Sequence, residues 1–172
     1  YHTNKKMLTN WNPTSVKIIF TVTKNHKPYY VVSVKRVKKK HRLKKGFRWE
    51  FPGGKVDYKE SIEKALLREL EEEDPSKTLS SEFEYLQKKQ QGLEFRNITF
   101  YNMQRHTIFR CDLSKKKWDK LLSYYKKHGV KNKETYGFEL VSKKKADSLK
   151  TSGKQLWTPK TRKILKTLQK IN

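Results

Sequence analysis

Cysteine, long apolar runs and acidic residues are all scarce in this 172-residue chain. The one cysteine, Cys111, excludes an internal disulfide and is typical of a protein in a reducing, intracellular compartment. No apolar run is long enough to span a membrane and no signal peptide is recognisable, so we expect no membrane partner. The chain starts at Tyr1 rather than at methionine, which leaves open that a targeting segment was trimmed from its start.

Acidic side chains number only 17, against 42 lysines and arginines, and the formal net charge is +25. A charge of this size repels itself and therefore favours a polyanionic partner, of which nucleic acid is the usual one. We expect RNA binding, and the alternative is a lysine-rich surface that only keeps the protein soluble. Lysine-rich blocks occur along the whole chain, at residues 35–45, 115–120, 126–127, 143–145 and 160–170.

The length of the chain predicts one domain over residues 1–172. Hydrophobic residues make up only 34% of it, and the 12% of aromatic residues compensate in part because each buries a large area. Expected strands lie at residues 15–23, 29–36, 49–51, 93–101, 107–113 and 136–141, and expected helices at 62–73, 117–127, 142–149 and from Thr158-Pro159 onward. We expect residues 1–14 to be an N-terminal extension, 117–129 an inserted helix and 157–172 a C-terminal helix.

The acidic residues that do occur are concentrated, because eight of the 17 lie between residues 54 and 76. No glycine or proline occurs from Ile62 to Glu73, and Ser61 suits an N-cap, so this stretch predicts a helix. Ile62, Leu66 and Leu70 recur at helical spacing and would form the buried stripe of that helix.

Three carboxylates would share one face of this helix, because Glu69, Glu72 and Glu73 are spaced at i, i+3 and i+4. Like charges repel there, and the C-terminal end of a helix disfavours anions, so the arrangement favours a bound cation. Several hard oxygen ligands suit Mg²⁺ or Mn²⁺ rather than zinc. The alternative is a solvated acidic face, which leaves the regular spacing of the preceding residues unexplained.

A glycine, a glutamate, an Arg-Glu pair and a Glu-Glu pair are spaced through residues 54–76 as in G-x5-E-x7-R-E-U-x-E-E-x-G-U, where U is bulky and apolar. This pattern resembles the Nudix box, and the sequence WEFPGGKV at residues 49–56 is similar to the flank of the box in MutT-type proteins. Pro75 and Ser76 stand where the pattern has glycine and an apolar residue, which puts the path of the following loop in doubt. The resemblance implies an α/β fold, the Nudix α/β/α sandwich with a mixed central sheet, to which we expect extra C-terminal helices to be added.

The resemblance also implies a role for the residues of the box. Glu69, Glu72 and Glu73 would be the catalytic metal ligands, and the last two would also position or activate water. Arg68 would orient the glutamates through ion pairs without touching the substrate, and Glu60 would support the metal ligands indirectly.

Ligands from outside the helix often complete a site of this kind. The backbone carbonyl of Gly53 is one candidate. Glu134 is another, because it precedes the strand at 138–141 as a late glutamate ligand does in MutT-like chains. Glu139 is the second choice, and the alternative is that Glu134 is a loop residue without a role.

Basic residues near the expected cleft are candidates for binding substrate. Arg36 ends the second expected strand, and Lys38 follows in a basic loop that borders the cleft in this fold, so both would steer phosphates. Lys55, next to the paired glycines, is a third candidate. The alternative is that these charges only increase solubility.

Other residues that often carry chemistry are interpreted as structural. His41 and His106 have no partner at metal-ligand spacing and are expected to be ordinary polar positions. Cys111, on an alternating strand, is expected to be a small core residue. Aromatic residues of the strands, such as Phe51, could stack a base but more often belong to a core.

The expected activity is divalent-metal-dependent hydrolysis of a nucleoside-diphosphate linkage, which needs no nucleophilic serine or cysteine because water attacks phosphorus. The net charge favours RNA as the partner, with hydrolysis of a 5′-end pyrophosphate or cap preferred over that of a free nucleotide. The alternatives are a non-catalytic Nudix fold in an RNA assembly such as a ribosomal particle, and a MutT-like enzyme for damaged nucleotides. The leaving group and the oligomeric state stay open.

Overall fold

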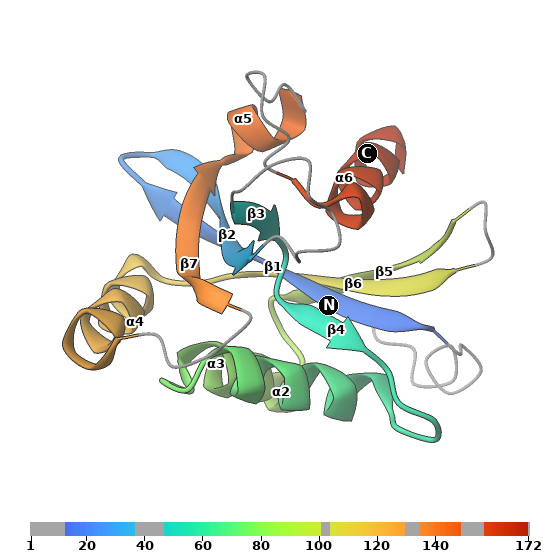
Figure 1. Cartoon of the computed structure of the whole chain (residues 1–172), viewed down its shortest axis with the longest axis horizontal. Coiled ribbons are helices and arrows are strands. Elements are labelled where there is room, and N and C mark those ends of the chain that lie inside the picture. The colour runs from blue at the N-terminus through green and yellow to red at the C-terminus, as the bar shows by residue number, and fades with distance from the viewer. Residues whose placement is uncertain (1–12, 37–46, 101–103, 130–134, 149–156, 172) are drawn as a thin grey trace.

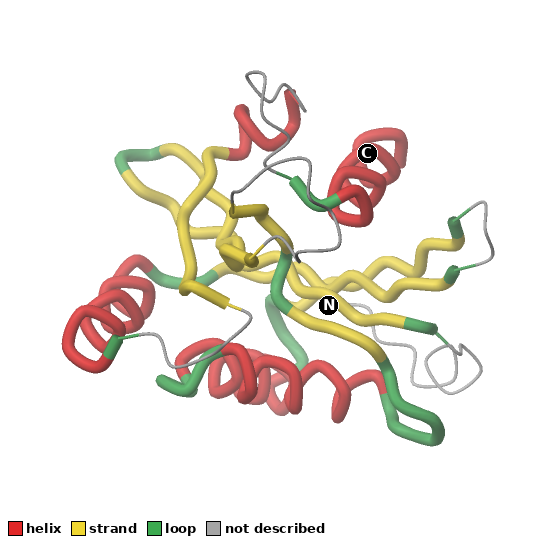
Figure 2. Tube along the Cα trace, viewed as in Figure 1, coloured by secondary structure: helices red, strands yellow, loops and turns green. Residues whose placement is uncertain are grey.

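The computed structural model describes residues 13–36, 47–100, 104–129, 135–148 and 157–171 (Figure 1). A seven-stranded sheet runs through the middle of this part of the chain, and helices cover both of its faces (Figure 2). The strands are β1 Ser15–Lys24, β2 Lys27–Arg36, β3 Phe47–Glu50, β4 Gly53–Lys55, β5 Leu93–Thr99, β6 Arg105–Asp112 and β7 Thr135–Ser142. The helices are α2 Ile62–Glu73, α3 Thr78–Lys89, α4 Lys115–His128, α5 Lys143–Ser148 and α6 Pro159–Ile171.

The sheet is mixed, because β1 lies parallel to β6 and the other pairs are antiparallel. The strand order is β3-β2-β1-β6-β5, with β7 paired to β2 and β4 paired to β1. On the edge of β1 away from β6, residues 21–24 pair with β2, whereas residues 15–17 pair with β4. The N-terminal half of β1 therefore lies against β4 instead of β2, and the N–H of Ile18 donates to the carbonyl of Pro52 at 2.9 Å.

Helices α2, α3 and α4 cover one face of the sheet, and α5 and α6 cover the other (Figure 1). The expected α/β/α sandwich with a mixed central sheet and additional C-terminal helices is confirmed. Within the described residues, no helix is both long enough and apolar enough to cross a lipid bilayer.

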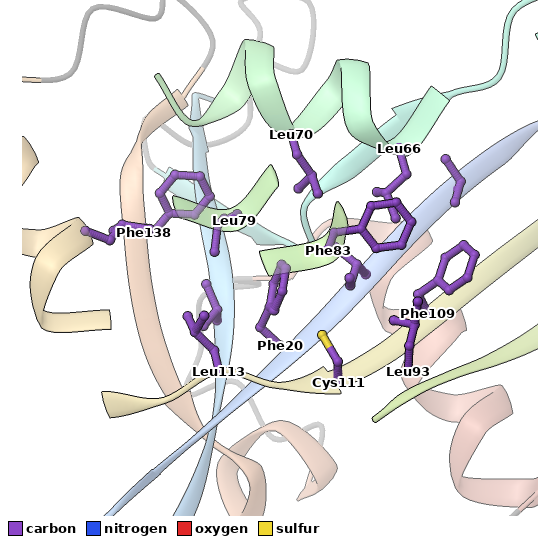
Figure 3. Close-up of a cluster of buried hydrophobic side chains, with 14 of the residues drawn as sticks. Phe20, Leu66, Leu70, Leu79, Phe83, Leu93, Phe109, Cys111, Leu113 and Phe138 are labelled. Atoms are coloured by element: carbon purple, nitrogen blue, oxygen red, sulfur yellow. The ribbon is translucent and has the colours of Figure 1, made fainter. Parts of the chain in front are cut away.

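The larger hydrophobic core lies between the sheet and α2, α3 and α4 (Figure 3). The predicted stripe of Ile62, Leu66 and Leu70 faces this core, with exposures of 4%, 0% and 0%. Cys111 also lies here, as expected of a small core residue, and burial raises the pKa of its thiol. A second core lies beneath α5 and α6, so the alternating side chains of β1 are buried on both faces of the sheet.

The expected elements are present, and their ends differ from prediction by at most two residues where the chain is described. Strand β4 was not expected as a strand. Helix α3 is a second exception, because no element was expected between residues 78 and 89. It begins after Lys77, which has a left-handed backbone with φ 61° and offers no side-chain cap. The apolar residues Leu79, Phe83 and Leu86, spaced at i, i+4 and i+7, are the sequence signal that was available.

Asp74 builds the turn that joins α2 to α3, where the chain departs from the Nudix pattern. Its buried carboxylate accepts hydrogen bonds from the backbone N–H of Ser76 at 3.2 Å and of Leu79 at 2.9 Å. Its carbonyl accepts one from the N–H of Lys77 at 3.0 Å. An aspartate thus supplies the turn for which the family pattern uses glycine, and Pro75 only has to end α2.

Candidate active site

Two glycines in β4 bring this strand close to α2 and to β1. A Cβ atom on Gly54 would lie 2.3 Å from Cδ of Glu69, and one on Gly53 would lie 2.1 Å from the carbonyl oxygen of Val16. Gly53 also has φ +133°, a backbone conformation that L side chains rarely adopt. Only glycine therefore fits at position 53, where the clash is with backbone, whereas a side chain at position 54 would displace the carboxylate of Glu69 that lies against β4.

Glu73 points to the same backbone from one turn further along α2. Its carboxylate is only 5% exposed and accepts from the N–H of Gly53 at 3.4 Å and from the hydroxyl of Ser33 at 3.5 Å. The Lys35 ammonium lies 3.6 Å away. Burial raises the pKa of Glu73 to about 7, against the opposing charge of Lys35. Partial burial also raises the pKa of Glu69, so two carboxyl groups with raised pKa values lie close together on this face of α2.

Arg68 links these carboxylates to the start of the helix. Its guanidinium donates to both oxygens of Glu60 at 2.9 Å and to Oε1 of Glu69 at 3.0 Å. It also donates to the carbonyl of Lys55 at 3.0 Å and lies 3.6 Å from Glu72. The hydrogen bond from Arg68 lowers the pKa of Glu60 to about 2. These contacts suit the orienting role implied for Arg68, which stays a prediction.

The third predicted ligand, Glu72, has a different environment from its two neighbours. Its side chain is 59% exposed, whereas that of Glu69 is 17% exposed. Among the described residues, no group of three or more acidic, histidine or cysteine side chains is close enough together to hold a metal ion. The donors nevertheless fit a hard divalent cation in kind, because the carboxylates of Glu69 and Glu73 lie against the backbone of Gly54 and Gly53 and Glu72 adjoins them on the same helix.

Lys17 is a residue of this site that sequence reasoning missed. Its ammonium donates to Oε1 of Glu50 at 2.5 Å and to the carbonyl of Gly53 at 3.4 Å. The carbonyl expected as an extra metal ligand is therefore already bonded to a cation of the chain. The available signal was a lysine between Val16 and Ile18 in a strand that is otherwise almost free of charge.

Glu139, the second choice for an additional ligand, is not brought to the site. It pairs with Val32 on β2, and Val32 belongs to the core beneath α5 and α6. The Glu139 carboxylate accepts a hydrogen bond from Nε1 of Trp49 at 3.1 Å. It therefore lies on the face of the sheet opposite Glu69 and Glu73.

Several residues that were predicted to bind substrate or metal are not described by the structure, or are described only in part. Arg36 ends β2 as expected, but its side chain is not described. Lys55 is exposed at the end of β4, next to the site. The predicted residues that lie outside the described ranges are Lys38, His41 and Glu134.

His106 is not the ordinary polar position that was expected. It is fully buried, its Nδ1 is hydrogen bonded to the hydroxyl of Ser15, and its ring lies 4.5 Å from that of Phe100. Burial lowers its pKa to about 4, so the ring is neutral near pH 7. Phe51, by contrast, is 1% exposed and belongs to the core, as expected.

A cavity of about 1,460 Å³ opens beside the start of α2 and shares Lys55 and Glu60 with the contacts of Arg68. Tyr58 on its rim is 91% exposed, and the ammonium of Lys59 lies 5.5 Å from the centre of the Tyr58 ring. The lysines that line the cavity are Lys55, Lys59, Lys64 and Lys160. The cavity thus combines an exposed aromatic ring with four lysines at the start of α2, whereas Glu69, Glu72 and Glu73 are not among the residues that line it.

Comparison with known proteins shows which family the chain belongs to. The model of the NUDIX domain matches residues 11–120, well over half of the chain. A mutT/nudix family protein from Listeria innocua has 19% identity and a TM-score of 0.52, over 94% of this chain and 95% of that one. No curated protein matches the chain by sequence.

Two other solved structures share the fold. The NUDIX domain of Shewanella oneidensis NrtR, in complex with ADP ribose, has 13% identity and a TM-score of 0.51, over 99% of both chains. The T. brucei MERS1–RNA complex has 11% identity and a TM-score of 0.51, over 87% of this chain and 60% of that one. At such low sequence identity, similarity to these structures shows only a shared fold. The match of the NUDIX domain model to residues 11–120 shows the family, and the chain belongs to the Nudix family of hydrolases.

Proposed function

We propose that the chain is a Mg²⁺- or Mn²⁺-dependent hydrolase of a nucleoside-diphosphate linkage. The observation that carries this proposal is the meeting of the Glu69 and Glu73 carboxylates at the backbone of Gly53 and Gly54. Burial raises the pKa of both carboxyl groups, so their ionised forms gain from a nearby cation. When bound, a divalent ion would neutralise the diphosphate and lower the pKa of a water molecule.

The residues of this candidate site would have different roles in metal binding and hydrolysis. Glu69 and Glu73 would hold the metal, and Arg68 would keep Glu69 in position through the hydrogen bond at 3.0 Å. Glu72, with 59% exposure, has the access to solvent that a proton acceptor for the attacking water needs. Lys35, beside Glu73, would donate to a phosphate oxygen of the substrate.

For the substrate, we favour the 5′ end of an RNA, as a pyrophosphate or a cap, over a free nucleotide. Single-stranded RNA binds to basic grooves that offer aromatic rings for stacking, and the cavity supplies the Tyr58 ring and four lysines, against the three acidic residues Asp57, Glu60 and Glu63. The cavity shares Lys55 with the contacts of Arg68, so an RNA whose 5′ end lay at Glu69 would have a basic surface for its next nucleotides. The T. brucei MERS1 structure, with the same fold, was determined with RNA bound.

The experiment that tests this proposal measures release of phosphate or nucleotide with Mg²⁺ and with Mn²⁺. The substrates are 5′-triphosphorylated RNA, capped RNA, deoxynucleoside triphosphates and dinucleoside polyphosphates. We expect release from an RNA substrate, and a loss of roughly 100-fold or more in Glu72→Gln and Glu73→Gln. Glu71→Gln is the matched control, because Glu71 is exposed on the same helix and has no contact with the site.

The other outcomes of this experiment separate the alternatives. Preference for deoxynucleoside triphosphates over every RNA would favour a MutT-like role and overturn the RNA proposal. No release from any substrate, with tight RNA binding retained, would support a non-catalytic role in an RNA assembly.

A further inference from the structure

Lys17 is buried in the candidate active site, although lysine is among the residues least often buried. Its side chain is 4% exposed, and no other described lysine or arginine falls in the buried class. Taking an ammonium group out of water is unfavourable, so a buried lysine requires compensating partners. The partners here are Glu50 at 2.5 Å and the carbonyl of Gly53 at 3.4 Å.

The surroundings of this ammonium are those of a metal ion. It contacts a backbone carbonyl and a carboxylate, which are the kinds of oxygen donor that a divalent ion also takes. A divalent ion bound to the same carbonyl would have to approach to about 2.0–2.6 Å, within a few ångströms of a like charge. The Gly53 carbonyl therefore does not suit both cations at once.

We infer that Lys17 is a built-in cation of the active site, which occupies the Gly53 carbonyl and excludes a divalent ion from it. Metal is thereby confined to the carboxylates of α2, with Glu69 and Glu73 as its innermost donors. This inference rests on the proposed function and makes Lys17 a positioning residue that sets how many metal ions the site takes. It replaces the expectation that the Gly53 carbonyl is a metal ligand.

A purely structural ion pair between Lys17 and Glu50 is the competing explanation. The two explanations differ in what happens when both charges are removed together. If the pair only stabilises the fold, its joint replacement leaves metal binding unchanged. If Lys17 occupies a metal position, its replacement frees the Gly53 carbonyl for Mn²⁺.

The test counts Mn²⁺ ions bound per chain, and their affinity, by electron paramagnetic resonance of free Mn²⁺. The variants are Lys17→Met with Glu50→Gln, which leaves no buried unpaired charge, and Lys17→Arg, which keeps the cation. Lys24→Met is the matched control, because Lys24 lies on the same strand but is exposed. Circular dichroism and thermal unfolding of each metal-free variant show whether it is folded.

We expect the double variant to bind one more Mn²⁺ than the wild type, or to bind it on the order of tenfold more tightly. Lys17→Arg and Lys24→Met should keep the wild-type number and affinity. Unchanged Mn²⁺ binding in a folded double variant overturns the inference, whether or not the wild type binds metal.

Failure of the inference about Lys17 can be distinguished from failure of the proposed hydrolase function. A wild type that hydrolyses its substrate, with the same Mn²⁺ binding as the double variant, contradicts the role of Lys17 alone. A wild type without any hydrolysis, whose double variant gains a Mn²⁺ site, supports the role of Lys17 and contradicts the proposed function.

Discussion

The hydroxyl of Tyr125 in α4 donates a hydrogen bond to the buried carboxylate of Asp74, the residue that ends α2. The same carboxylate accepts from the backbone of the turn and of the first residues of α3, so one side chain joins three helices. Glu73 immediately precedes Asp74 in the chain. The position of this candidate metal ligand therefore depends on a contact made by α4.

Replacing Tyr125 by phenylalanine should lower the free energy of unfolding by about 1.5–3 kcal/mol, the usual contribution of a hydrogen bond to a charged group. Denaturation in urea measures this change. Tyr124→Phe is the control, because the Tyr124 ring packs on His128 and the hydrogen bond to Asp74 comes from Tyr125. An equal loss in both variants would show that the hydroxyl–carboxylate bond contributes nothing specific.

Replacing Gly54 by alanine should weaken metal binding more than it weakens the fold. The new Cβ would lie 2.3 Å from Cδ of Glu69, and the flexible side chain can move away while the backbone stays. Mn²⁺ affinity should fall on the order of tenfold or more, as for other changes that displace a ligand. Gly129→Ala has no atom within 4 Å of its Cβ and should cost about 1–3 kcal/mol of backbone strain, because φ 71° with ψ 174° is a conformation that essentially only glycine adopts, without any change in Mn²⁺ affinity.

Buried His106 should make the protein sensitive to acid. Burial lowers its pKa to about 4 in the folded state, below the ordinary value of 6.5, so the unfolded chain binds more protons between these two values. The stabilisation is therefore fully present above about pH 6.5 and is lost as the pH falls through about 4. The loss should reach roughly 3 kcal/mol.

Chemical denaturation between pH 4 and 8 checks this expectation in the wild type and in His106→Gln. The variant should lose the part of the pH dependence that His106 contributes. His128→Gln is the control, because His128 is exposed at the end of α4 and should leave the profile unchanged. Identical profiles for wild type and His106→Gln would contradict the prediction.

Tyr58 should contribute to RNA binding through stacking. Tyr58→Ala should weaken the binding of single-stranded RNA about tenfold, since one base stacked on an aromatic ring contributes roughly 1–3 kcal/mol. Lys59→Gln should reduce the slope of log affinity against log salt concentration by about one. Fluorescence anisotropy with labelled RNA at several salt concentrations measures both effects.

The control for this prediction is Tyr85→Ala. Tyr85 is 53% exposed and lies within 5.6 Å of two lysine ammonium groups, but it belongs to α3 and does not line the cavity. If both tyrosine variants weaken binding equally, RNA contacts the basic surface as a whole rather than the cavity.

Helix α2 could be predicted from the sequence because its signals are local. Ser61 accepts a hydrogen bond from the N–H of Lys64, as an N-cap does, and the apolar stripe of the helix repeats every four residues. Such patterns depend on neighbours within one or two turns and are visible without the fold. Helix α3 lacked a local start signal, since the carboxylate of Asp74, outside the helix, accepts from the N–H of Leu79 in its first turn.

The sequence by itself determined the three glutamates of the site, their spacing on one helix, and the excess of positive charge around them. Only the tertiary structure decided which lysine ammonium group contacts each carbonyl or carboxylate oxygen of the site. Lys17 and Gly53 are 36 residues apart, and their contact exists because β1 pairs with β4 rather than β2 over its first residues. The burial of Glu73 beside Lys35 likewise depends on the packing of α2 against the sheet. Contacts of this kind arise from strand pairing over long separations, which no local pattern of residues records.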